Sequence, residues 1–346
     1  MKKRILLAGL CALALSIWPE SSAAEADNGL PTIADARMLS PFGGRANVSP
    51  NGKRIVFVGK TYGDAYELEI ATGKLRNLTA GFPHQGIMRI QYLPSGDFLV
   101  TAPRILAGAN TRAHLEMWVL AKDLERGLQP LGEQVFEGIA NSKRRNLIAW
   151  TMIEPEMAQG ENWQLGFARP TKRYVAEVRV VDGMASLANK REIMPGLPEQ
   201  CRFIEPQDFR ANDSELVYSC MGFTAGGGIL ISVMGNSIAE DRNVTYYRKE
   251  GEYNEVEGIA PDGSWAAVEC GKQEAKGLPE LDICRLELEH GGSMTRLVRG
   301  VVPGSTSDIS NPVVTPDGKS LIFQRSDSAA PDIGEGYGIY ILPLGP

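Results

Sequence analysis

The chain has 346 residues, of which 43% are hydrophobic and 23% are charged, and its formal net charge is −6. It is long enough and apolar enough to bury a large core. An acidic chain without a basic run argues against nucleic acid or an anionic membrane surface as its partner.

The N-terminus carries the pattern of a secretory signal. Lys2, Lys3 and Arg4 precede an apolar stretch over residues 5–17, and small residues follow at 21–24. We therefore predict a signal peptide over residues 1–24 and a periplasmic or secreted mature protein over residues 25–346 that does not insert into a membrane. A retained membrane anchor is the alternative, but the apolar stretch is short for a bilayer span.

The mature chain repeats one short phrase. VSPNGKRIVFV at 48–58 returns as VTPDGKSLIFQ at 314–324, and four further copies lie between them. Their separations of 44, 47, 70, 50 and 55 residues are those of propeller blades. The copies are anchored at Pro50, Pro94, Asn141, Ala211, Pro261 and Pro316.

Each copy has the chemistry of a β-turn that leads into a strand, because Pro presets φ for the first central residue and Gly accepts a positive φ. In the first unit, strand-like runs follow at 54–58, 65–70 and 75–79. We predict an all-β fold, a six-bladed β-propeller of four-stranded antiparallel blades, as a single domain over 25–346. A free strand over residues 32–39 would pair with residues 337–342 and close the ring.

The phrase SPNGKRIVF, together with YELEIATGKLRNLT at 66–79, closely resembles the TolB-type propeller repeat. The resemblance covers nearly the whole mature chain, but only as repeats, since residues 25–46 leave no room for the N-terminal α/β domain of TolB itself. It implies a non-catalytic protein of the cell envelope that binds a protein or peptide partner.

The loops between second and third strands should gather on one face, opposite the tight turns. Because recognition residues usually lie on long loops of a rigid scaffold, we expect the binding site there rather than among the tight turns. Loop carboxylates there could bind calcium, although a solvated acidic surface explains them as well. The candidate binding residues are Tyr62, Asp64, Arg104, His114, Trp163, Asp332 and Tyr337.

Four cysteines remain in the mature chain, at positions 201, 220, 270 and 284. An even number in an exported protein indicates disulfides, and we predict the local pairs Cys201–Cys220 and Cys270–Cys284. A zinc site is the alternative, but the CxxC spacing and nearby histidines that it needs are lacking.

Catalytic signatures are mostly absent from the sequence. It has no GxSxG motif, and its histidines at 84, 114 and 290 show no motif spacing. We therefore expect a monomeric, non-catalytic exported propeller that binds a protein or peptide partner and needs no cofactor. The alternative is a periplasmic enzyme, or an enzyme accessory, that acts on oligosaccharides or peptides. Metal bound through His114 would favour that alternative.

Overall fold

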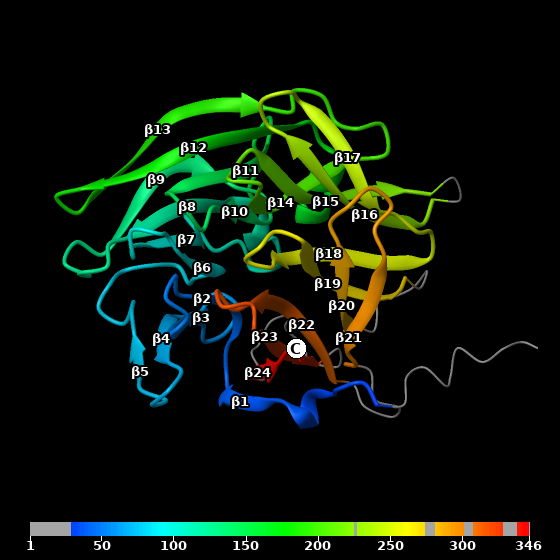
Figure 1. The fold of residues 1–346 in the computed structure, drawn as a ribbon. Helices are drawn as coiled ribbons and strands as arrows, with labels where there is room; N and C mark the ends of the chain where they lie inside the picture. Colours follow the sequence, from blue (N-terminus) through cyan, green and yellow to red (C-terminus); the bar gives the residue numbers. More distant parts are fainter. Residues whose placement is uncertain (1–28, 225–226, 274–280, 301–306, 328–337, 346) are drawn as a thin grey trace, which may run out of the picture. The chain divides into compact units, whose positions relative to one another are not determined.

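The computed structural model describes residues 29–224, 227–273, 281–300, 307–327 and 338–345. From Pro31 onward the chain forms one compact unit of six four-stranded antiparallel sheets (Figure 1). This confirms the predicted six-bladed propeller. The predicted signal peptide over residues 1–24 lies outside the described residues. No helix among the described residues is long and apolar enough to cross a membrane.

The strands of the first five blades are hydrogen-bonded in the order of the sequence. Blade one consists of β2 (Gly44–Val48), β3 (Arg54–Val58), β4 (Ala65–Glu69) and β5 (Leu75–Asn77). Blade two consists of β6 (Arg89–Tyr92), β7 (Phe98–Pro103), β8 (Leu115–Leu120) and β9 (Leu128–Gln134). Blade three consists of β10 (Ile139–Asn141), β11 (Leu147–Ile153), β12 (Thr171–Val181) and β13 (Met184–Ile193). Blades four and five consist of β14 (Phe203–Arg210), β15 (Glu215–Phe223), β16 (Ile229–Ser237) and β17 (Arg242–Tyr247); β18 (Glu252–Ile259), β19 (Trp265–Lys272), β20 (Asp282–Glu287) and β21 (Met294–Val298).

The sixth blade joins strands from both ends of the described chain. It contains β22 (Ser307–Val314), β23 (Ser320–Asp327) and β24 (Ile339–Pro343), and β1 (Arg37–Ser40) pairs antiparallel with β24 (Figure 1). The predicted strand over 32–39 was too long at its start. There a capping box, in which Asp35 accepts a hydrogen bond from the Thr32 backbone N–H at 2.8 Å, begins the short 3-10 helix η1 (Ile33–Asp35).

The turn phrase has the conformation predicted from its residues. The N–H of Gly52 donates to Ser49 O at 2.8 Å, and the N–H of Gly318 donates to Thr315 O at 2.8 Å. Both glycines have positive φ, 70° and 71°. These turns join the first and second strands of their blades, so they lie on one face, while the connections between second and third strands lie on the other.

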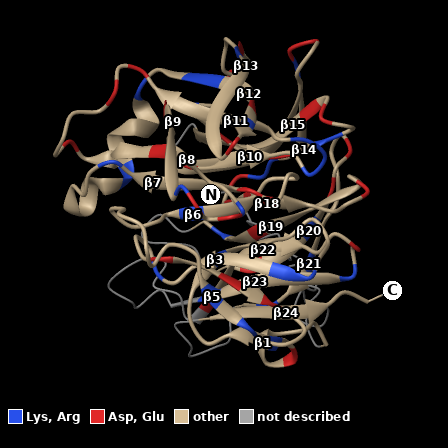
Figure 2. Cartoon of the chain, turned by 90° about the vertical axis from the view of Figure 1, so that its left-hand side faces the viewer, with Lys and Arg blue, Asp and Glu red and all other residues tan. Residues whose placement is uncertain are grey.

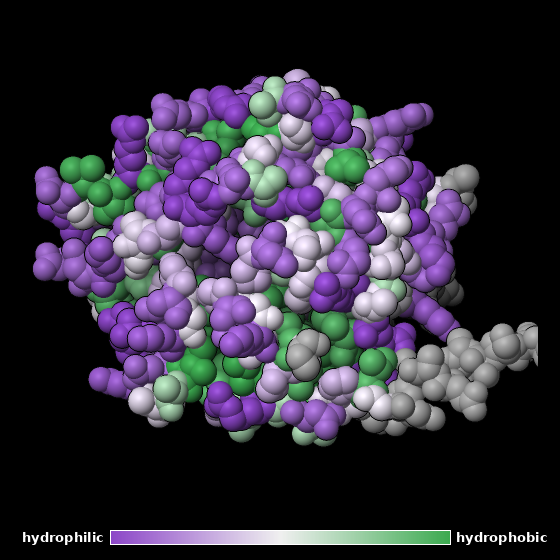
Figure 3. Space-filling view, viewed as in Figure 1, coloured by the Kyte–Doolittle hydropathy of each residue, from purple (hydrophilic) through white to green (hydrophobic). Residues whose placement is uncertain are grey.

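Hydrophobic clusters lie between neighbouring blades and hold them together. Between blades six and one, for example, Ile322 and Ile339 pack with Ile55 and Phe57, and all four are fully buried. Burial of each such side chain contributes roughly 1.5–3 kcal/mol. Hydrophilic side chains cover most of the surface seen in Figure 3.

Both predicted disulfides are present. Cys201 bonds to Cys220 with a Cα–Cα distance of 5.3 Å, and Cys270 bonds to Cys284 with 5.9 Å. The second bond joins β19 to β20 across the loop between them.

Candidate functional site

A cavity of about 240 Å³ lies where the inner strands of all six blades meet. It opens on the face of the tight turns, because the turn prolines Pro50, Pro94, Pro261 and Pro316 form part of its wall. A smaller space of about 30 Å³ adjoins it and shares some of its lining. We call these two spaces the central channel. The binding site was expected on the opposite face, so the channel was not predicted from the sequence.

Charged residues of both signs line this channel or lie close to it. Figure 2 marks the positions of Lys and Arg in blue and of Asp and Glu in red along the strands. The charged residues of the channel come from the inner strands, a few residues before the turns. Arg45 on β2, Arg89 on β6 and Glu257 on β18 line the channel, and Glu205 on β14 and Glu255 on β18 lie close to these residues. These charged residues could have been noticed in the sequence. They lie just before the turn phrases, in strands that must line the centre of a propeller, where polar side chains indicate a functional site.

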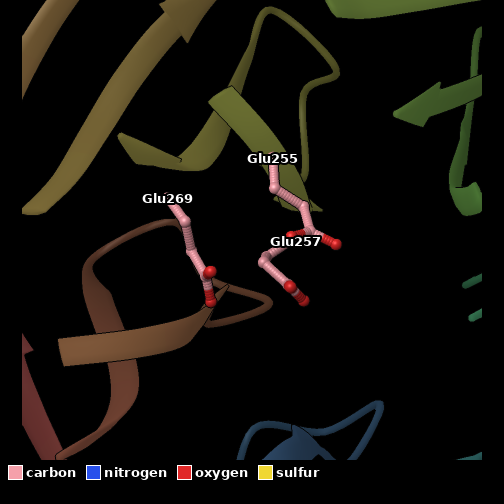
Figure 4. A group of neighbouring side chains, drawn as sticks. All are labelled: Glu255, Glu257 and Glu269. Atoms are coloured by element: carbon pink, nitrogen blue, oxygen red, sulfur yellow. The ribbon is translucent and has the colours of Figure 1, made fainter. Parts of the chain in front are cut away.

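Three carboxylates form the densest part of this set. Glu255 and Glu257 extend from β18, and Glu269 extends from β19, where it is paired with Glu255 across the two strands. One oxygen of each lies within 4.8 Å of the others, and the three side chains reach into the same space (Figure 4).

Neutral donors hold all three carboxylates. The Tyr253 hydroxyl donates to Glu255. Asn311 donates twice, from its backbone N–H to Glu269 Oε1 at 2.6 Å and from Nδ2 to Glu257 Oε1 at 3.1 Å. Among the described residues, no lysine or arginine forms an ion pair with any of the three. The cluster is therefore fixed in place without a countercharge from the described residues.

Burial and mutual repulsion raise the pKa values of Glu257 and Glu269. Burial raises the pKa of Glu257 to about 7, although Arg89 and Arg45 act in the opposite direction. Burial and the neighbouring Glu257 and Glu255 raise the pKa of Glu269 well above its ordinary range. Because both effects disfavour the ionised form, the cluster at neutral pH needs either protons or a bound cation.

Two left-handed residues shape the channel wall. Arg45 has φ 55° and Asn311 has φ 48°, and each lies where the register of its inner strand shifts at a bulge. The backbone N–H of Arg45 donates to Gln324 Oε1 at 2.6 Å, just as that of Asn311 donates to Glu269. Gln324 and Glu269 occupy the same position in their blades, eight residues after the turn proline. Each of these two side chains lies on the second strand of its blade and binds the inner strand of the next blade.

The 3-10 helix η2 (Gly108–His114) lies between the second and third strands of blade two and supplies Arg112. Arg112 forms an ion pair with Glu137, and its guanidinium lies 4.9 Å from the centre of the Trp163 ring. Trp163 begins the 3-10 helix η3 (Trp163–Ala168). Trp163, one of the predicted binding residues, thus packs against Arg112. Burial raises the pKa of Tyr62, another predicted residue, and Arg112 and Arg45 lie close enough to lower it in part.

The other predicted face residues take structural contacts. Asp64 accepts hydrogen bonds from Asn77 Nδ2 at 2.7 Å and pairs with His84 Nε2 at 3.0 Å. Arg104 forms an ion pair with Glu116. His114 is buried, and its Nε2 has no hydrogen-bond partner in the described part of the chain. Asp332 and Tyr337 lie outside the described residues.

The chain matches no family model and no curated protein. Among solved structures it is similar to a gluconolactonase from Xanthomonas campestris (TM-score 0.52, 11% identity, 90% of each chain covered). It is also similar to an oligogalacturonate lyase from Vibrio parahaemolyticus (TM-score 0.51, 12% identity, 90% of this chain and 92% of that chain). A putative TolB from Agrobacterium tumefaciens matches with TM-score 0.38 and 12% identity over 87% and 90% of the two chains. At these identities the likeness concerns the fold alone, so a specific TolB-like family remains a prediction.

Proposed function

We propose that this chain is a non-catalytic exported binding protein whose central channel holds a divalent cation of the calcium class. The observation that carries the proposal is the cluster of Glu255, Glu257 and Glu269, in which three carboxylates lie within 4.8 Å and are held by neutral donors. Its two disulfides support export, because such bonds persist in oxidising compartments.

The donor set suits a hard cation. Calcium binds carboxylate and amide oxygens with flexible geometry, and each of the three glutamates has one oxygen that accepts no hydrogen bond from the described residues. A cation among them would replace the repulsion between the carboxylates with attraction and would lower the raised pKa values of Glu257 and Glu269.

A fourth carboxylate next to the cluster adds independent support. Glu205 is only 4% exposed, yet it has no hydrogen bond or ion pair with any described residue. Burial raises its pKa, and Glu255 is the neighbour that raises it most. A buried acid without a partner is rare, and a cation bound beside Glu255 would supply the missing countercharge.

Calorimetric titration tests the cation site. Protein freed of metal with a chelator is titrated with calcium, magnesium and manganese chloride up to about 10 mM, since sites of extracellular modules bind at roughly 0.1–1 mM. We expect one calcium per chain in the wild type and at least a tenfold loss of affinity in Glu257→Gln. Glu240→Gln is the matched control, because Glu240 is exposed and pairs only with exposed Arg242. Wild-type protein that binds none of the three cations would contradict the proposal.

The face of the long loops is the proposed surface for a protein or peptide partner in the cell envelope. Several large hydrophobic side chains are exposed there, on the second-to-third-strand connections of blades two and three and at the strand ends that flank this connection in blade four. Exposed apolar side chains gathered over neighbouring loops are typical of protein-binding surfaces. They are Ile105, Leu106, Leu165, Phe223 and Ile229.

Capture from a periplasmic extract tests this surface. The variant L106D/L165D/F223D should lose a partner that wild-type protein retains. Val181→Asp is the control, since Val181 is equally exposed but lies at the β12–β13 turn on the opposite face. The same set of captured proteins from wild type and the triple variant would place the partner elsewhere.

One observation favours the enzymatic alternative. Glu257 has a pKa of about 7 and lines the open cavity, as a general acid or base would. Acidic oligosaccharides and peptides should then be turned over by wild-type protein and only bound by Glu257→Gln. Binding without turnover by wild-type protein would contradict the enzymatic alternative and would support binding as the function.

A further inference from the structure

We propose that Arg45, Arg89 and Gln207 form a binding subsite for the carboxylate of an organic acid in the central channel. None of these three residues belongs to the cation site, so the subsite does not depend on a bound cation. All three side chains line the smaller space of about 30 Å³.

The first observation is that both guanidinium groups lack partners within the part of the chain that the structure describes. Neither Arg45 nor Arg89 forms a hydrogen bond or an ion pair through its side chain with any residue described. The Nε of Arg45 is buried and has no acceptor among residues 29–224, 227–273, 281–300, 307–327 and 338–345. Arginine side chains inside a protein are normally paired, so these donors are available to a ligand.

The second observation is the crowding of positive charge. Burial, followed by the neighbouring Arg89 and Arg112, lowers the pKa of Arg45 to about 10. Like charges that are held together in this way attract an anion, and guanidinium groups match the two oxygens of a carboxylate.

The backbone holds Arg45 in this arrangement. Its φ of 55° is uncommon for a residue with a long side chain, and the hydrogen bond from its N–H to Gln324 maintains the bulge. Backbone conformations of this kind gather at ligand sites.

A third donor faces the same space. Gln207 is 6% exposed, its Nε2 has no hydrogen-bond partner among the described residues, and it lines both parts of the channel. A carboxylate between the two arginines and this amide would satisfy all three donors.

Glu257 is the acid that competes with the ligand. It lines both spaces, and Arg89 and Arg45 each lower its pKa. Its Oε1, however, accepts from Asn311 Nδ2 at 3.1 Å, and it forms no ion pair with either arginine. Glu257 thus shares the space without occupying the guanidinium donors.

The adjoining cavity sets the size of the ligand. Its volume of about 240 Å³ equals that of about eight water molecules. Tyr92, Val48 and Val313 supply apolar surface, and Asn47, Gln91 and Asn141 supply amides. This suits one amino-acid-sized group that enters from the face of the tight turns with its carboxylate first. A free organic acid and the C-terminal residue of a peptide share this chemistry.

Calorimetric titration with N-acetylalanine and with its C-terminal amide tests whether the subsite binds a carboxylate. The same titration with acetyl-tetraalanine, with a free or an amidated C-terminus, tests whether the ligand is a free acid or the end of a peptide. We expect each acid to bind at least about tenfold more tightly than its amide. Tighter binding of the tetrapeptide assigns the subsite to peptide C-termini, and tighter binding of N-acetylalanine assigns it to free acids.

Arg45→Gln and Arg89→Gln should each lower the affinity for the acids at least about tenfold, and Arg89→Lys should also weaken it because the planar fork is lost. Arg242→Gln, on the exposed edge of β17, should bind as the wild type does. Thermal unfolding checks that each variant is folded, and if Arg45→Gln is not, the two Arg89 variants decide. Equal binding of acid and amide, or wild-type affinity in the Arg89 variants, would overturn the proposal.

The same titrations separate this subsite from the cation site. With chelator present, Glu257→Gln should still bind the acids although it has lost calcium. The Arg89 variants should still bind calcium. Wild-type protein that binds calcium but not the acids would therefore count against the carboxylate subsite alone.

Discussion

Asn311 Nδ2 lies 3.1 Å from Glu257 Oε1, and this hydrogen bond joins blade six to blade five inside the central channel. The backbone N–H of Asn311 also donates to Glu269, at 2.6 Å. One residue of blade six therefore positions two carboxylates of blade five. The same contact that joins the two blades builds the proposed cation site.

Asn311→Gly should weaken calcium binding about tenfold, because glycine keeps the positive φ but loses a hydrogen bond to a charged group. Titration of calcium into the chelator-treated variant measures the loss. Asn189→Gly is the control, since Asn189 also has positive φ, 57°, and donates to Glu177 at 3.2 Å on exposed β13. Wild-type affinity in Asn311→Gly would show that the Asn311 side chain does not position the site.

Glu269→Gln should keep the fold and lose calcium. Gln324, at the same position of blade six, shows that a glutamine accepts the backbone N–H of the next inner strand, here that of Arg45 at 2.6 Å. Glu269→Gln should therefore unfold at nearly the wild-type temperature without cation, whereas Glu269→Ala should unfold earlier. Thermal unfolding and calcium titration measure the two effects. Equal unfolding temperatures of the two variants would show that this bond does not stabilise the contact between the blades.

The repeated turn phrase was sufficient to predict the fold, because Pro and Gly fix the turn locally. Pro50 and Gly52 need only their own φ preferences to form the Ser49–Gly52 hydrogen bond. The disulfides were equally local, with separations of 19 and 14 residues.

The channel could not be predicted in the same way, since its geometry depends on long-range contacts. Asn311 meets Glu269 across 42 residues of sequence, and Arg45 meets Gln324 across 279. The bulges that turn Arg45 and Asn311 toward the channel have no fixed sequence signature. Only the polar residues of the inner strands, such as Glu205 and Glu257, signalled a functional centre.

Removing the Cys270–Cys284 bond should destabilise the protein by about 3 kcal/mol, because the bond restricts the unfolded chain by closing a loop with a separation of 14 residues. Urea unfolding of C270S/C284S against wild type measures the difference. C201S/C220S provides a comparison, since its bond closes a loop of similar length, 19 residues. Unchanged stability of C270S/C284S would mean that other contacts already hold β19 against β20.

The half-buried Glu257 should make the stability of the metal-free protein fall as pH rises. Its pKa is raised from an ordinary value of 4.5 to about 7 in the folded state. Between these values the folded state holds a proton that the unfolded state has released, so the free energy of unfolding decreases through this window by up to about 3 kcal/mol. Above pH 7 this contribution is constant.

Glu257→Gln removes the titrating group, so it should be more stable than wild type at pH 8 and lose this advantage at pH 4.5. Urea unfolding at both pH values, in chelator, measures the difference, and Glu240→Gln serves as the exposed control. Calcium should restore the stability of wild-type protein at pH 8, because it binds the ionised folded state, and should do little for Glu257→Gln. A difference between the two proteins that is the same at both pH values would show that Glu257 ionises in the folded state as it does in the unfolded chain.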